Sequence, residues 1–430
     1  MAKAFGNLRR TLSAIACLSF VFLPGILLAQ NYDDPGLGQK PVAAHPQDYK
    51  PLGIRAGSFM LHPGLELAVE FNDNVFYSSL IQENDTIYHI RPYITAQSTW
   101  SKHSLSVRLA ADIGRYSDFG FRDYEDFFFI IGGKVDVKTQ SYFSYGANYM
   151  RLHEDLNTRS AEQGREQTVY TLIGGNLGYD HTFNRLSVGG MYTFSALDFE
   201  NAVAIDGDPI DNEDRDRDVS SWMLRAGYQF KTDIQGFVAY TGNKVKYDQR
   251  LDRNGFDRSS DGYTLTGGVS FMITGKLNGD VAMNYFDQNY DDPRLEDISG
   301  WGGSAGLQWK ATDLTSVYGQ IVSGVEQTTN PNSSGYLRTL YSLRVDHELL
   351  RYLQLNGFIS YSDFDYQLTN DAPEDARSSD KIFRAGFGVN WFINRWLYLS
   401  ASYDYEKLTT NVPNQDYDVN RIWLTLGMER

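Results

Sequence analysis

The side chains of this sequence best suited to ligand chemistry are arginines and lysines spaced within runs of alternating residue type. Guanidinium groups pair bidentately with carboxylates and phosphates. A row of these groups on one face of a sheet would therefore favour an anionic ligand such as a uronic-acid polysaccharide. The opposing interpretation is structural, because arginines and acidic residues on neighbouring strands also pair and stiffen a sheet. Both interpretations stay open. The candidates for lining a pore are Arg108, Arg225, Lys244, Arg338, Arg344, Arg384 and Arg421.

Catalytic patterns are scarce. An enzyme needs a nucleophile with its base, or paired carboxylates, and neither a G-x-S-x-G nor an H-E-x-x-H motif occurs. His153-Glu154-Asp155 could mimic the acid–base cluster of an outer-membrane protease, but ordinary charged residues at the start of a loop explain it better. We therefore expect no enzymatic activity and no cofactor.

Acidic residues concentrate between Asp206 and Asp218, where seven carboxylates stand against Arg215 and Arg217. Hard cations prefer such oxygen clusters, so Ca²⁺ or Mg²⁺ binding at a lipopolysaccharide surface is one interpretation. A solvated outer loop is the other, and it is the one we favour. The segment Asp252–Asp257 superficially resembles a calcium loop but lacks the full twelve-residue pattern and its closing glutamate. We therefore expect no metal site.

Composition and charge narrow the classes of protein. Tyr, Phe and Trp make up 14% of the 430 residues, Gly is abundant at 39, Pro is scarce at 12, and mean hydropathy is −0.41. Such a composition favours many strands and few helices. The single cysteine, Cys17, excludes a disulfide scaffold, and the net charge of −15 excludes the basic footprint that a nucleic-acid partner requires.

The N-terminus has the layout of a secretory signal peptide. Lys3, Arg9 and Arg10 precede an apolar stretch over residues 12–28, and Ala29-Gln30 offers a cleavage point. No later segment has the ~18 consecutive apolar residues of a transmembrane helix. We expect a signal peptide over residues 1–29, a periplasmic N-terminal tail over 30–53 and a single further domain over 54–430.

That domain repeats one pattern from about Leu65 onward. Runs of about 10–15 residues alternate apolar and polar side chains; in one of them Trp222 and Leu224 share a face opposite Met223 and Arg225. Period two is the pattern of a strand. The runs are long for a globular sheet and match a tilted membrane strand, which needs ~9–11 residues.

The connections between runs alternate between tight and long. Eight tight turns and nine longer loops would join eighteen strands with both termini on the turn side, as in bacterial outer-membrane barrels. A soluble β-sandwich or propeller would not need this arrangement. The turns are expected near 101–104, 138–141, 181–184, 231–233, 274–276, 310–313, 349–352 and 393–395. The loops are expected near 72–86, 117–124, 154–165, 200–217, 248–261, 289–298, 327–335, 365–380 and 407–417.

The opening of this domain carries a family resemblance. The segment Pro51–Leu67, followed by Phe71–Phe76, resembles the start of the "putative β-barrel porin 2" family of Gram-negative outer-membrane proteins. Members of that family are often found with exopolysaccharide or capsule secretion genes. The last strand departs from the usual pattern, because the chain ends in Arg430 rather than an aromatic residue.

These observations predict an all-β fold: a transmembrane antiparallel outer-membrane β-barrel of about 18 strands in a Gram-negative bacterium. The preferred function is a conduit for export of an extracellular or capsular polysaccharide. A general or solute-specific diffusion porin and a structural or adhesive protein anchored by its barrel are the alternatives. The expected partners are outer-membrane lipid and lipopolysaccharide, and for an export conduit an anionic polysaccharide and a periplasmic export apparatus.

Overall fold

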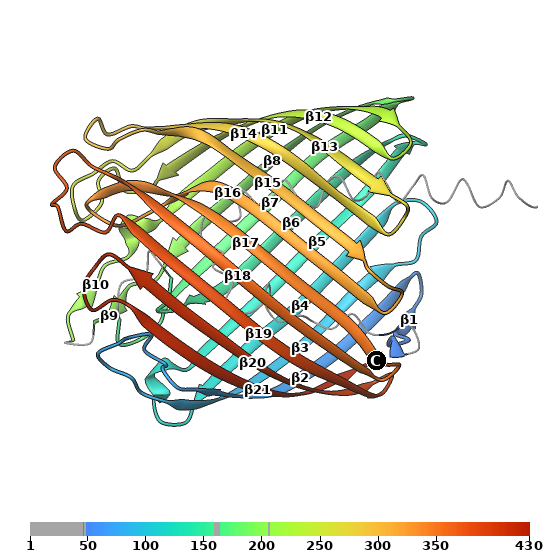
Figure 1. Ribbon diagram of the computed structural model, residues 1–430, viewed down its shortest axis with the longest axis horizontal. Helices are drawn as coiled ribbons and strands as arrows, with labels where there is room; N and C mark the ends of the chain where they lie inside the picture. Colours follow the sequence, from blue (N-terminus) through green and yellow to red (C-terminus); the bar gives the residue numbers. More distant parts are fainter. Residues whose placement is uncertain (1–45, 47–48, 159–163, 205–206) are drawn as a thin grey trace, which may run out of the picture.

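The computed structural model describes residues 46, 49–158, 164–204 and 207–430, and there the chain forms one closed antiparallel barrel (Figure 1). Eighteen long strands each pair with two neighbours, and the ladder between the first and the last closes the ring, which confirms the predicted fold. The strands are β2 (Phe59–Asn72), β3 (Asp85–Ser98), β4 (Ser104–Tyr116), β5 (Tyr124–Lys138), β6 (Ser141–Glu154), β7 (Thr168–Phe183), β8 (Leu186–Phe199), β11 (Arg217–Lys231), β12 (Ile234–Tyr247), β13 (Ser260–Ile273), β14 (Leu277–Tyr290), β15 (Ile298–Lys310), β16 (Thr315–Gln327), β17 (Ser333–Leu350), β18 (Leu353–Leu368), β19 (Ser379–Asn394), β20 (Leu397–Thr410) and β21 (Tyr417–Glu429).

The middle of each strand follows the alternation seen in the sequence. On β11, Trp222 and Leu224 point outward and are 42% and 63% exposed, while Met223 between them is 5% exposed. Successive side chains of a strand point to opposite faces, so one face meets lipid and the other meets the lumen. The closed ring leaves no unpaired sheet edge between β2 and β21, as a bilayer requires.

Turns and loops lie at opposite ends of the barrel, and they confirm the predicted alternation. Eight turns of two to five residues lie at one end: 99–103, 139–140, 184–185, 232–233, 274–276, 311–314, 351–352 and 395–396. Nine loops lie at the other, and we number them loop 1 (73–84), loop 2 (117–123), loop 3 (155–167), loop 4 (200–216), loop 5 (248–259), loop 6 (291–297), loop 7 (328–332), loop 8 (369–378) and loop 9 (411–416). The loops hold the short elements η2 (Gly120–Arg122), β9 (Ala202–Val203), β10 (Pro209–Ile210) and η3 (Glu213–Arg215).

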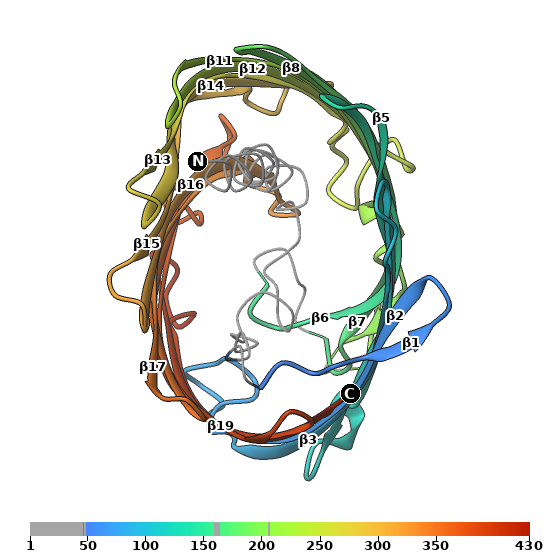
Figure 2. The ribbon, with the colours of Figure 1, turned by 90° about the vertical axis from the view of Figure 1, so that its right-hand side faces the viewer.

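The chain enters the barrel through its turn end. Tyr49 packs inside the lumen, its ring centroid 6.0 Å from that of Phe392, and β1 (Ile54–Ala56) then forms a hairpin with the start of β2. β1 lies outside the barrel outline (Figure 2) and takes the place next to β2 that the end of β21 leaves open. The predicted signal peptide and residues 30–45 and 47–48 of the predicted tail lie outside the described residues.

Near the loops the inward face becomes apolar, which the sequence analysis did not anticipate. Three clusters of buried hydrophobic side chains line the loop end of the lumen. The first contains Phe128, Met150, Leu152, Tyr170, Leu172, Leu197, Phe199, Val219, Val245 and Tyr247. The second contains Tyr336, Phe364, Tyr366, Ile382, Leu408, Tyr417 and Val419, and the third Phe286, Tyr290, Leu295 and Ile298. Among the described residues, no helix is long and apolar enough to cross a membrane.

Candidate functional site

The candidate site is a cavity of about 970 Å³ inside the barrel. Its lining runs along the inner faces of β5 to β18 and includes the turns at 139–140 and 232–233. None of the described loop residues lines it, so the cavity occupies the turn half of the lumen. Viewed from the turn end, the barrel is oval rather than round (Figure 2). The cavity therefore lies on one side of this oval, under the strands from β5 to β18.

The cavity wall combines apolar surface with amide groups, charged side chains of both signs and aromatic rings. Eight amide side chains line it: Gln140, Asn184, Gln229, Gln235, Asn278, Gln308, Gln320 and Asn356. Its cationic side chains are Lys134, Lys138, Arg185, Arg225, Arg338 and Arg344, and its carboxylates are Asp136, Asp180, Asp233 and Asp280. Tyr142, Phe237, Phe271, Tyr318 and Phe358 contribute the rings. Amides both donate and accept hydrogen bonds, so this wall suits a ligand rich in hydroxyl groups.

Three of the seven predicted pore residues lie in this wall, each beside an aromatic ring. Arg225 on β11 lies over Phe237, with 4.0 Å between the guanidinium carbon and the ring centroid. On β17, Arg338 lies 3.4 Å from a Glu326 carboxylate oxygen, and Arg344 donates to Asp346 at 2.9 Å. Arg338 and Arg344 therefore pair with acidic neighbours, as the structural interpretation expects, and they also face the cavity. Whether these residues select ions remains a prediction.

Arg384 and Arg421 lie in the other half of the lumen, on the two sides of Glu406. Their guanidinium nitrogens lie 3.0 and 3.2 Å from Glu406 Oε2, and Glu406 is only 1% exposed. Two loops reach this group: Asn157 of loop 3 donates to Glu406 at 3.3 Å, and Arg421 donates to the Tyr77 hydroxyl of loop 1 at 3.1 Å. These five residues tie loops 1 and 3 to the inner wall at the loop end of this half.

Arg108 points into the lumen but is not part of the cavity lining. Its guanidinium carbon lies 4.9 Å from the centroid of the Tyr93 ring, and it donates to Thr95 Oγ1 at 3.5 Å.

The prediction that Lys244 lines the pore is wrong. Lys244 is exposed on the outward face of β12, which it shares with Val238 and Tyr240, whereas Val245 faces inward and is fully buried. Beyond the lipid the outward face of a strand meets water, and the inward face packs under the loops. The rule that polar side chains face inward therefore reverses at the loop end of the strand.

His153 of the His-Glu-Asp segment sits in a buried charge cluster. Its two ring nitrogens face Asp126 at 2.9 Å and Asp155 at 3.3 Å, and the Tyr124 ring stacks on it at 3.7 Å. Glu154 points elsewhere, to Arg215. His153 is 6% exposed, so the geometry gives this group a role in holding the start of loop 3.

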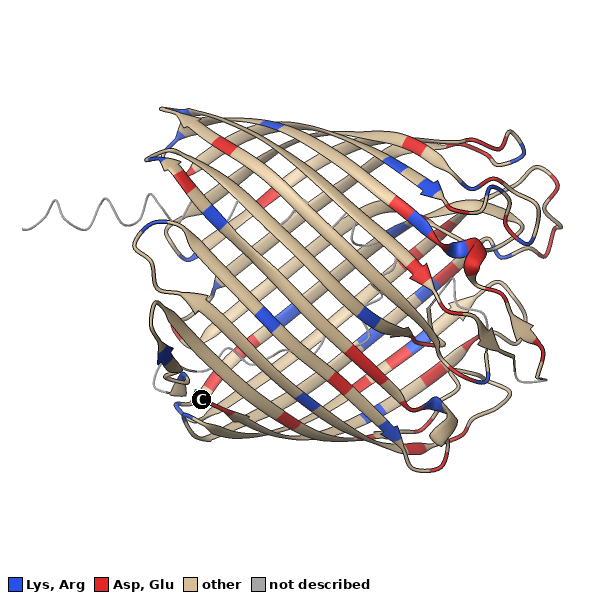
Figure 3. Cartoon of the chain, turned by 180° about the vertical axis from the view of Figure 1, so that it is seen from behind, with Lys and Arg blue, Asp and Glu red and all other residues tan. Residues whose placement is uncertain are grey.

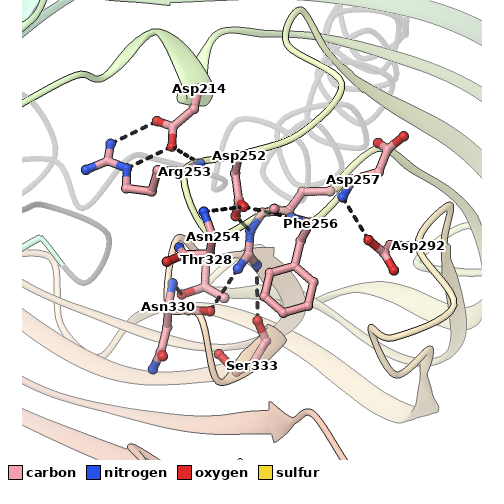
Figure 4. A network of polar contacts seen from close by, with 12 residues as sticks. Asp214, Asp252, Arg253, Asn254, Phe256, Asp257, Asp292, Thr328, Asn330 and Ser333 are labelled. Carbon is pink, nitrogen blue, oxygen red and sulfur yellow. Dashed lines mark hydrogen bonds and ion pairs between the residues drawn. The ribbon is translucent and has the colours of Figure 1, made fainter. Parts of the chain in front are cut away.

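The loops above the cavity are tied to one another by arginines (Figure 4). Arg253 of loop 5 pairs with Asp214 of loop 4 through two nitrogens, each 2.8 Å from a carboxylate oxygen. Arg258 donates to Asp252 at 2.6 Å and to two backbone oxygens, those of Asn330 and Ser333, at the base of loop 7. Charged residues are dense at this end of the barrel (Figure 3). Loops 4, 5 and 7 thus form a linked cover, which the expectation of a solvated acidic loop missed.

The electrostatics of this cover give a pH prediction. Burial alone would raise the pKa of the Asp214 carboxyl, but the hydrogen bonds and charge of Arg253 outweigh it and hold that pKa below its ordinary value. Hydrogen bonds from the Arg294 side chain likewise hold the pKa of Asp292 in loop 6 well below its usual range. A depressed pKa contributes stability that is present above the ordinary value of about 3.9 and is lost as the pH falls through the folded-state pKa.

We therefore expect the cover to stay closed from pH 8 to about pH 5 and to loosen below about pH 4. Hydrogen exchange of peptides 207–216 and 248–259, corrected for intrinsic rates, should show protection falling only at acid pH. In Arg253→Gln, protection of the same peptides should already be low at pH 7. A wild-type profile that is flat down to pH 3 would contradict this assignment.

No group of three or more His, Cys, Asp or Glu side chains able to hold a metal ion occurs in the described part of the chain. Asp252, the first residue of the segment resembling a calcium loop, instead accepts hydrogen bonds from Arg258 and from the backbone N–H groups of Asn254 and Phe256. Asp214 of the acidic loop is likewise engaged by an arginine.

The family to which the sequence is matched agrees with this architecture. The sequence profile of the family described as putative beta-barrel porin 2 matches residues 45–430. No curated protein is significantly similar to the chain in sequence. Among solved structures, OpdL of Pseudomonas aeruginosa is 10% identical with a TM-score of 0.45, covering 87% of this chain and 99% of its own. A BenF-like porin from Pseudomonas fluorescens Pf-5 is 12% identical with a TM-score of 0.46, covering 86% and 99%. OccAB2 of Acinetobacter baumannii is 11% identical with a TM-score of 0.46, covering 87% and 99%.

Proposed function

Because the chain belongs to the putative beta-barrel porin 2 family of outer-membrane β-barrels, we propose that it conducts a hydroxyl-rich, weakly anionic polymer out of the cell. This polymer is an extracellular or capsular polysaccharide. The observation that carries the proposal is the wall of the 970 Å³ cavity, with its eight amides, its aromatic rings and its cationic side chains outnumbering carboxylates by six to four.

Each part of this wall has a use for such a ligand. Amide groups exchange hydrogen bonds with successive hydroxyl groups, and rings such as Phe237 and Tyr318 offer apolar faces to the C–H groups of a sugar. Carboxylates of the polymer are attracted by the guanidinium groups of Arg225, Arg338 and Arg344. Because Arg338 and Arg344 also pair with acidic neighbours, each attraction is weak. Conduction requires several sites of this kind, since one strong site would trap the ligand.

The route from the cavity to the outside passes the linked loops. A polymer in transit has to displace the cover formed by loops 4, 5 and 7, whose ties are side-chain pairs such as Arg253 with Asp214. We expect the pairs that hold the cover to break when the polymer fills the cavity. Without polymer, we expect the cover to keep the conductance for small ions low.

Two other functions make different predictions. A diffusion porin for small solutes should conduct ions freely in planar bilayers without any polymer. A barrel that only anchors its loops should neither conduct nor affect polymer at the cell surface, and the large cavity with its charged and amide side chains argues against it.

The test changes the three cavity arginines together, Arg225→Gln, Arg338→Gln and Arg344→Gln. At about 8 Å in water each charge contributes roughly 0.5 kcal/mol to the energy of a passing ion, so the anion-to-cation permeability ratio should fall several-fold. Reversal potentials of the channel measured in a salt gradient report this ratio, and surface polymer should fall with it.

Lys244→Gln is the matched control, because it removes one cationic charge from the outward face. We expect its reversal potential and polymer level to stay at wild-type values. If the triple variant also keeps both values, the channel is not selective through these arginines and the export proposal fails.

A further inference from the structure

The wall of the barrel is interrupted between β15 and β16. Their ladder contains seven residue pairs, from Lys310–Ser316 at the turn end up to Ser304–Val322, and stops there. Both strands continue toward the loops, over 298–303 on β15 and 323–327 on β16, without pairing to each other. Every other ladder between neighbouring barrel strands has at least nine pairs. We call this unpaired stretch the seam.

Beyond the seam, the β16–β17 hairpin packs against the inner faces of β14 and β15. A Cβ atom on Gly335 of β17 would lie 2.9 Å from Ile298 Cδ1, and Val325 and Leu337 pack against the cluster that contains Phe286 and Ile298. The tip of the hairpin is held there by Arg258 of loop 5, which donates to the backbone oxygens of Asn330 and Ser333. The hairpin therefore overlaps its neighbours instead of continuing the wall.

The seam starts at the level of the loop-side interface between membrane and water. Trp301 and Trp309 face outward on β15, 69% and 46% exposed. They are eight positions apart along β15, about 26 Å of strand, or about 20 Å along the membrane normal for a strand tilted by about 40°. This separation places them toward the two interfaces, where barrels carry aromatic girdles. The loop-side girdle, at Trp301, lies within the unpaired stretch. Backbone left unpaired at membrane depth is tolerated only where it is covered by protein or lines a cavity.

The seam also adjoins the large cavity. Ser304, Leu307, Tyr318 and Gln320 line that cavity on the paired part of the two strands. Directly beyond them, a small cavity of about 30 Å³ is lined by Ser323, Gly324 and Val325 and by residues of β14, including Asn284 and Phe286. Moving from the large cavity toward the seam, the wall changes from polar amides to the apolar cluster of Phe286, Tyr290, Leu295 and Ile298.

We propose that the seam is a lateral portal, through which an amphipathic molecule passes between the cavity and the outer leaflet of the membrane. The polar cavity holds its head group, the apolar cluster beside Phe286 receives its acyl chain, and the overlapping hairpin is the element that moves. This exit is distinct from the axial route, which passes the linked loops 4, 5 and 7. The inference goes beyond the proposed conduit function and does not require it.

The experiment closes the seam with a disulfide. A Cβ atom on Gly302 would lie 3.2 Å from Ser323 Cβ, close to the range that a disulfide spans, so Gly302→Cys with Ser323→Cys should link the two strands. The probe is a lysophospholipid with a diazirine on its acyl chain, added to proteoliposomes of the full barrel. In the reduced variant and the wild type we expect light-induced labelling of the peptide spanning 284–298. Oxidation should abolish that labelling, and reduction should restore it.

Leu307→Cys with Gly319→Cys is the matched control. Its Cβ atoms would lie 3.8 Å apart and join the same strands where the ladder already joins them, so oxidation should leave labelling unchanged. Gly324→Trp, which fills the seam without a crosslink, should also lower labelling. Labelling confined to outward residues such as Trp301 and Ile321, or labelling that oxidation of Gly302→Cys with Ser323→Cys leaves intact, would overturn the portal. Ion selectivity through the cavity arginines is measured separately, so either proposal can fail alone.

Discussion

Leu224→Arg is expected to deplete the folded barrel from the outer membrane. Leu224 is 63% exposed on the lipid face of β11, between Gly190 of β8 and Tyr240 of β12. An arginine facing lipid near the bilayer midplane costs about 2–4 kcal/mol, which lowers the equilibrium constant for assembly roughly 30-fold to several hundred-fold. Semi-native gels, in which folded barrels migrate differently from heat-unfolded ones, measure the folded fraction directly.

Arg225→Leu, one residue along the same strand, is the matched control. Arg225 faces the cavity over Phe237, so its replacement leaves the lipid face unchanged, and we expect near-normal assembly. Equal loss of assembly in both variants, or equal tolerance of both, would show that the two faces of β11 do not separate lipid from lumen.

Glu406→Gln is expected to destabilise the barrel strongly. Arg384 and Arg421 both pair with Glu406, which is 1% exposed, and removing its charge leaves two guanidinium groups in a buried site without their shared carboxylate. Breaking a buried ion pair from one side costs about 3–5 kcal/mol. The temperature at which the purified barrel loses its folded gel mobility should therefore fall, and the single-channel current should become noisier as loops 1 and 3 detach.

The neutral version of the same cluster separates charge from packing. In Glu406→Gln combined with Arg384→Gln and Arg421→Gln the two guanidinium charges are removed together with their shared carboxylate, so thermal stability should recover toward the wild-type value. The current should stay noisy, because the bonds from Asn157 and to Tyr77 are weakened or lost in either variant. A single variant as stable as the wild type would show that other carboxylates, such as Glu70 and Asp404, compensate Arg421.

Much of the architecture could be read from the sequence, because a bilayer leaves a barrel few alternatives. Alternation such as that of Trp222, Leu224 and Tyr228 against Met223 and Arg225 places side chains on two faces whatever the neighbouring strands are. The even count of strands, the short turns at one end and the long loops at the other then follow from closing the sheet. The inward direction of Arg225, Arg338 and Arg344 followed from the same local rule.

Only the tertiary structure determines which partners those side chains contact in the lumen. Lys244 points outward and Val245 inward because, beyond the lipid, water meets the outer face and loops pack on the inner one. Arg384 of β19 and Arg421 of β21 both pair with Glu406 of β20, and alternation within a single strand cannot reveal such a contact. The eight amide side chains of the cavity wall carry no charge pattern and come from eight different strands or turns. Alternation determines which face a residue occupies, whereas its partner depends on the register between strands and on which loops fold inward, and both are properties of the assembled ring.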